Sequence, residues 1–131
     1  MKDLLVRGAP SAAAIILSCS AYGQAYAAKP VRFVVPFVPG GPTDIQGRML
    51  GEKLGQRLGQ QVIIDNRGGA GGNIGMELTA KSPPDGHTIV IATVGTRAVN
   101  PYLYQLPFDP VKDFAPITQV STMRGRRSGG R

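Results

Sequence analysis

Three short segments of this chain combine glycine with hydroxyl, amide or charged side chains, and each follows an apolar run. The first reads Pro-Gly-Gly-Pro-Thr-Asp at residues 39–44, just after the largely apolar residues 31–35. A strand that ends in a glycine-rich loop at a helix start presents backbone N–H groups to an anion. This pattern predicts a small-anion site suited to a carboxylate, with the candidate residues Pro39, Gly40, Gly41, Thr43 and Asp44.

The second and third segments add candidates for the same ligand. Gly72 and Asn73 lie in a second glycine-rich stretch, where the backbone of a helix start can approach a ligand closely. The alternative for this stretch is a mobile glycine turn. Thr93 and Thr96 carry hydroxyls suited to donating to a carboxylate, and Arg97 adds positive charge.

Two charged candidates have plain structural alternatives. Asp44 falls in the first turn of the expected helix, where a carboxylate favours the helix dipole. It would either accept a hydrogen bond from a ligand amine or hydroxyl, or brace the loop and order its waters. Arg97 would either reach the ligand or lie solvated at the surface.

The residues needed for nucleotide binding, metal binding or catalysis are missing from the sequence. No Gly-Lys-Ser/Thr is present, and the third glycine of a dinucleotide fingerprint counted from Gly69 would fall at Ile74. His87 is the only histidine and Cys19 the only cysteine, so no metal-ligand set exists. Asp44 is the only acid in a candidate loop, and no nucleophile is matched to a base. We therefore expect no catalytic residue, no metal and no cofactor, and hence not an enzyme.

Strands and helices alternate along the chain and would position these loops. Apolar runs predict strands, and helical spacing predicts helices between them. In chain order the prediction is strand 31–35, helix 43–58, strand 61–64, helix 74–81, strand 88–93 and strand 116–120. Strands that are apolar throughout predict a parallel sheet covered on both faces. The three loops should then gather at the carboxyl ends of the strands.

The first helix carries three separate signals. Thr43 and Gln46 match a capping box at its start, and Gly59 ends it. Large apolar residues at roughly helical spacing predict a buried face made of Ile45, Met49, Leu54 and Leu58. Small residues at a spacing of four predict close packing against the sheet through Gly47, Gly51 and Gly55.

The net charge of +7 does not indicate a nucleic-acid partner, because it is concentrated at the two ends. Between residues 28 and 120, nine Lys and Arg residues stand against seven Asp and Glu residues, which leaves no basic face. Residues 122–131 have no apolar periodicity. We expect them to be disordered, as a truncated or frameshifted reading frame would make them.

The first 27 residues predict an export signal and a periplasmic location. Lys2 and Arg7 precede a short apolar core at residues 12–17, and Ala25-Tyr26-Ala27 forms a cleavage site. An alternative places cleavage before Cys19, which would leave a lipid-anchored cysteine. A third alternative is a buried N-terminal helix.

A series of motifs occurs in unbroken order across residues 28–121. It comprises Lys29-Pro30-Val31, Pro39-Gly40-Gly41-Pro42-Thr43-Asp44, Asp65-Asn66-Arg67, Gly71-Gly72-Asn73, Pro84-Asp85-Gly86, Asn100-Pro101 and Phe108-Asp109-Pro110. This series resembles the Bug/TctC family, the extracytoplasmic solute receptors of tripartite tricarboxylate transporters.

The resemblance implies a monomeric periplasmic receptor whose two α/β lobes close on a small carboxylate and deliver it to membrane permease subunits. Family members often carry His where this chain has Arg97, and they are more than twice as long. We therefore expect an α/β, type II periplasmic-binding-protein-like lobe over residues 28–121, with a mostly parallel sheet and the second lobe missing. Such a partial first lobe should bind ligand weakly or not at all.

Two other functions stay open at the level of sequence. A ligand-loaded receptor can signal to a membrane sensor, and the leader and carboxylate loops are common to both roles. A small α/β enzyme acting on a carboxylate substrate is the third hypothesis, although it would need an acid/base pair.

Overall fold

The computed structural model describes residues 29–122. The predicted export signal, the Cys19 anchor and the tail beyond Thr122 lie outside the described residues.

Three short parallel strands form the centre of the fold: β1 (Val31–Val35), β2 (Val62–Asn66) and β3 (Thr88–Val90). Their order is β2-β1-β3, with Val31 opposite Val62 and Arg32 opposite Thr88. The predicted parallel sheet is confirmed. The strand expected at 116–120 is wrong, because this segment pairs with no strand among the described residues, and Ile117 is 78% exposed there.

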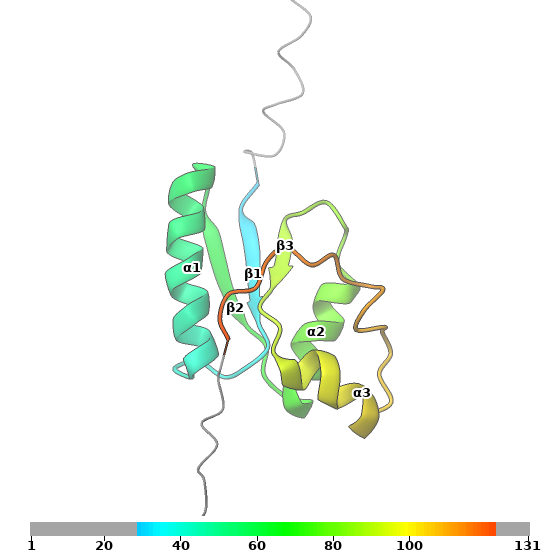
Figure 1. The fold of residues 1–131 in the computed structure, drawn as a ribbon. Coiled ribbons are helices and arrows are strands. Elements are labelled where there is room, and N and C mark those ends of the chain that lie inside the picture. Colours follow the sequence, from blue (N-terminus) through cyan, green and yellow to red (C-terminus); the bar gives the residue numbers. More distant parts are fainter. Residues whose placement is uncertain (1–28, 123–131) are drawn as a thin grey trace, which may run out of the picture.

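Helices α1 (Pro42–Leu58) and α2 (Asn73–Ala80) cover opposite faces of the sheet (Figure 1). The chain moves from β1 to β2 in one direction and from β2 past β1 to β3 in the other. Right-handed crossovers in opposite directions place successive helices on opposite faces. The order of strands reverses at β1, and ligands of open parallel sheets bind at such a point.

The segment after β3 is helical, although the sequence predicted a glycine-containing loop around Thr96 and Arg97. A π-helical turn, η3 (Gly95–Val99), runs directly into the short helix α3 (Asn100–Leu103). A 3₁₀ turn, η2 (Ala70–Gly72), leads into α2 in the same way. Both turns lie at the carboxyl edge of the sheet, where they present helix starts rather than loose loops.

The face of α1 that meets the sheet combines glycines with Leu50 and Leu54, which pack against the core. A Cβ on Gly47 would lie 2.8 Å from Val35 Cγ2, and one on Gly51 would lie 2.8 Å from Ile64 Cδ1. The predicted glycine packing is therefore confirmed. The predicted apolar face is wrong in part, because Ile45 and Met49 are more than half exposed. The glycines let the helix backbone approach the sheet and turn the large residues beside them outward.

The predicted capping box at the start of α1 is also wrong. The helix begins at Pro42 with Gly41 as its N-cap, and no side chain bonds at that cap. Thr43 therefore lies inside the first turn, where its hydroxyl is not at the capping position. The side chain of Asp44 instead reaches back to the backbone N–H of Gly40 at 2.8 Å. The predicted C-cap is confirmed, since Gly59 adopts φ +65°.

Candidate functional site

Asp44 is the centre of a hydrogen-bond network that holds the loop between β1 and α1. Its Oδ2 accepts from Gly40 N at 2.8 Å and from Arg48 Nε at 2.9 Å. Its Oδ1 accepts from Asn66 Nδ2 at 2.9 Å, and Asn66 also donates to Phe37 O at 3.2 Å. Both carboxylate oxygens are therefore engaged by the protein, which supports the bracing role for Asp44.

The same contacts keep Asp44 ionised in an almost fully buried position. The side-chain bond from Arg48, the backbone N–H of Gly40 and the amide of Asn66 together lower its pKa from 3.8 to about 2. Burial acts in the opposite direction and is outweighed. The negative charge of Asp44 is paired with Arg48 next to the candidate loop.

The other candidates in the first loop are more open than Asp44. Pro39 and Gly40 are exposed, while Gly41 and Thr43 are half-buried. Gly40 adopts φ +85°, which only glycine takes without strain. Its N–H is used by Asp44, and Pro42 has no N–H, so the first-turn donors left at α1 are those of Thr43 and Asp44, which have no intrahelical acceptor.

The second loop packs directly against the first. A Cβ on Gly75 would lie 2.8 Å from Pro36 Cα and 2.9 Å from Arg67 O. A Cβ on Gly72 would lie 3.2 Å from Pro36 O and 2.7 Å from Thr96 Cγ2. The glycines therefore permit a close approach, and Gly72 joins all three predicted loop regions. Gly72 is not in a loose turn, since it is buried with φ +95°.

The third segment is held by its own hydroxyls. Thr96 Oγ1 accepts from Thr93 N at 3.0 Å and lies 3.0 Å from Thr93 O, to which it donates. Thr93 Oγ1 accepts from Thr96 N at 3.3 Å. Thr96 is fully buried, so its hydroxyl supports the turn rather than facing a ligand. Arg97 donates from Nε to Pro110 O at 3.2 Å and is half-buried, so it is not a purely solvated arginine.

Three polar residues of this region were missed as candidates from sequence. Arg48 and Asn66 complete the Asp44 network, and Asn100 donates to Asn73 Oδ1 at 2.6 Å. Asn66 ends an apolar strand, and Asn100 follows the third segment by three residues. Polar amides at the carboxyl edge of a parallel sheet were the available signal.

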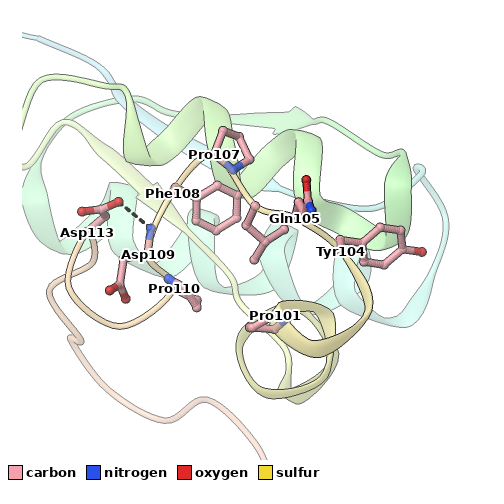
Figure 2. Close-up of a pocket in the computed structure, with 9 residues that line it drawn as sticks. Pro101, Tyr104, Gln105, Pro107, Phe108, Asp109, Pro110 and Asp113 are labelled. Carbon is pink, nitrogen blue, oxygen red and sulfur yellow. Dashed lines mark hydrogen bonds between the residues drawn. The ribbon is translucent and has the colours of Figure 1, made fainter.

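A separate hollow of about 790 Å³ lies between α3 and the segment 104–113 (Figure 2). Its lining includes Asp109 and Asp113, and Asp113 accepts from the backbone N–H of Asp109 at 2.7 Å. Backbone N–H groups of Lys112 and Val111 lower the pKa of Asp109, so its carboxylate stays negative. Two carboxylates make this hollow unsuited to an anionic ligand.

Neither a metal centre nor a membrane span is found in the described part of the chain. Between residues 29 and 122, no three His, Cys, Asp or Glu side chains gather closely enough to hold a metal ion. No helix in that range has the length and apolar character needed to cross a bilayer.

A doubly wound parallel sheet with three glycine-containing turns at its carboxyl edge defines a lobe of the α/β binding-protein class. Residues 47–125 match the model of the tripartite tricarboxylate transporter family receptor, TctC. The chain belongs to this family, as the sequence resemblance indicated.

Two curated relatives show the same relationship. A UPF0065 protein in the tcbD-tcbE intergenic region of Pseudomonas sp. is 42% identical over 100 residues, covering 76% of this chain and 30% of its own. Protein BugT of Bordetella pertussis is 41% identical over 97 residues, covering 72% and 30%. The chain thus spans about a third of the length of the relatives it matches.

Solved structures agree in fold. A periplasmic transporter structure aligns with a TM-score of 0.64 at 50% identity, covering 67% of this chain and 30% of that one. MatC from Rhodopseudomonas palustris, with bound malate, gives 0.63 at 40% identity, covering 66% and 30%. An R. palustris protein solved with adipate gives 0.56 at 40% identity, covering 62% and 27%. The fold class is confirmed as that of part of a periplasmic binding protein.

Proposed function

We propose that this chain supplies part of the first lobe of a periplasmic solute receptor that binds a small dicarboxylate for a tripartite transporter. One observation carries the proposal: three helix starts meet at the carboxyl edge of the sheet, in a chain of the TctC family. Related proteins were solved with malate and with adipate, and both compounds are dicarboxylates. The role proposed is binding and delivery, with no chemical step.

The electrostatics of the three turns support an anionic ligand. The first turn of α2 contains no acidic residue and no side-chain cap, so its positive end is not neutralised. The charge of Asp44 near the start of α1 is paired with Arg48 at 2.9 Å. The proposed ligand residues are those predicted from sequence, with two changes: Asp44 braces the first loop, and Thr96 supports the third turn from inside. Arg97 would add positive charge beside it.

Residues 29–122 would form one wall of the binding site. We propose that residues 1–27 direct export and that the permease subunits receive the ligand from the complete receptor. Of the two outcomes expected from sequence, weak binding or none, we propose weak binding. The chain spans about a third of the length of its relatives, so its affinity should be lower than that of a full-length relative.

The test is a titration of the full chain with malate, with adipate and with the neutral diamide of malate. We expect both dicarboxylates to bind saturably and the diamide not to bind, because the turns offer donors to an anion. MatC measured in parallel provides the full-length reference. Equal responses to malate and its diamide, or no response to either dicarboxylate, would contradict the proposal.

A further inference from the structure

Two buried asparagines meet at the carboxyl edge of the sheet. Asn73 is the first residue of α2 and is 8% exposed, and Asn100 is the first residue of α3 and is 6% exposed. Asn100 Nδ2 donates to Asn73 Oδ1 at 2.6 Å and to Gly71 O at 3.0 Å. A buried amide pair of this kind fixes the orientation of both side chains.

The hydrogen-bond partners determine how the side-chain amides of Asn73 and Asn100 are oriented. The carbonyl of Gly71 can only accept, so Asn100 must turn its amide nitrogen toward it. The same nitrogen faces Asn73, which must therefore present its oxygen. The nitrogen of Asn73, with two N–H donors, is turned the other way. Among residues 29–122 it has no hydrogen-bond partner, and it is not sealed from solvent.

These free donors lie at a helix start that is otherwise open to an anion. The N-cap of α2 is Gly72, which has no side chain to bond the first turn, and no acidic residue follows in that turn. The backbone N–H of Asn73 donates to Ala70 O, so the donors that this helix start offers are the remaining first-turn N–H groups, which lack intrahelical acceptors. Gly72 is fixed in place against Pro36 O and Thr96 Cγ2, where a side chain would not fit.

We propose that the Asn73 amide and the start of α2 bind one carboxylate group of the ligand, and that Asn100 is the positioning residue that orients this amide. The inference rests on the proposed function and deepens it by naming the donor and the residue that holds it. Asn100 does not touch the ligand. It acts by keeping the oxygen of Asn73 turned inward.

Two isosteric variants separate orientation from stability. Asn73→Asp keeps an inward oxygen for Asn100 but exchanges the free N–H groups for a carboxylate oxygen, which repels an anion. Asn100→Asp can only accept, so Asn73 must turn its nitrogen inward and its oxygen outward. Gln56→Glu adds the same charge on the exposed face of α1 and serves as the control.

The full chain and each variant are titrated with malate, and binding is monitored in two-dimensional ¹H–¹⁵N spectra. The thermal unfolding temperature of each variant is measured separately. We expect both variants to weaken malate binding by about tenfold or more, since a donor to a charged group is lost. Asn73→Asp should unfold at the wild-type temperature, and Gln56→Glu should bind as wild type does.

A purely structural role predicts the opposite pattern. Asn100→Asp would then unfold earlier while binding malate normally at temperatures where it is folded. Wild-type affinity in Asn73→Asp would overturn the inference and leave the proposed function standing. Should Asn100→Asp fail to fold, Asn73→Asp decides the question alone. The absence of any saturable malate response in the wild-type chain would overturn the proposed function, and this inference with it.

Discussion

Replacing Gly75 by Ala tests the contact that holds the second loop against the first. A Cβ at this position would lie 2.8 Å from both Pro36 Cα and Pro36 Cβ and 2.9 Å from Arg67 O. Ordinary carbon contacts are about 3.5–4.0 Å, so an added methyl group must displace its neighbours by roughly 0.7–1.2 Å. Two of the three neighbours are backbone atoms, which cannot turn aside as a flexible side chain can.

The magnitude follows from two opposing effects. Overpacking of a closed contact costs about 1–3 kcal/mol, and the rigid neighbours place Gly75 near the upper value. Ala is favoured over Gly inside a helix by about 1 kcal/mol. The net expectation is a loss of about 2 kcal/mol in the free energy of unfolding. For a domain of this size that lowers the melting temperature by about 8–16 °C.

Thermal and urea unfolding followed by circular dichroism measure this loss. Gly95→Ala is the matched control, because its nearest neighbour, Thr93 Oγ1, lies at an ordinary 3.5 Å and its φ is not positive. We expect the control to match the wild type or to gain up to about 1 kcal/mol. A Gly75→Ala chain as stable as the wild type, or an equal loss in Gly95→Ala, would refute the packing argument.

The other predictions concern the Asp44 network. Since the pKa of Asp44 is lowered from 3.8 to about 2, its stabilising effect is complete above pH 3.8 and is lost as the pH falls through about 2. Asp44→Asn should therefore lower the urea midpoint at pH 7 and make that midpoint decrease less as the pH falls below 3.8. A decrease as large as in the wild type would contradict this. Asn66→Ala removes donors to Asp44 and Phe37 O and should cost about 1–3 kcal/mol at pH 7. If Asn66→Ala lowers the free energy of unfolding by the same amount in the wild type and in Asp44→Asn, the two side chains are not coupled.

The parallel sheet and its loop edge could be predicted from sequence because they rest on strong local patterns. Largely apolar, β-branched runs at 31–35 and 88–93 are typical of strands in a covered parallel sheet, and Gly59 marks a helix end directly. The three loop regions follow from connectivity alone, since the carboxyl ends of parallel strands share one edge.

The errors arose where packing or partners decide the outcome. Apolar spacing favoured Ile45 and Met49 as the buried face of α1, but glycines allow a closer backbone approach and took that face instead. The segment 116–120 has strand-like residues, yet a strand forms only beside a partner, and none pairs with it in the described fold.

In the candidate site too, local sequence patterns identified residues, but their contacts depend on distant segments. Asp44 was predicted as a bracing or ligand-binding residue, but which partners its oxygens meet depends on Asn66, 22 residues away. Thr96 was expected to face the ligand because its hydroxyl lies beside glycine; a reciprocal bond with Thr93 turned it inward. Contacts between distant segments cannot be assigned from spacing alone.

A map of the backbone amides that respond to malate tests the central claim most directly. The full chain, labelled with ¹⁵N, would be titrated with malate and each shifted amide assigned. We predict that saturable shifts concentrate at the start of α1, at residues 72–75 and at residues 93–97, the three turns that meet at the carboxyl edge. Shifts centred on the acidic hollow beside α3, or a spectrum unchanged by malate, would contradict the assignment of a carboxylate site to this edge.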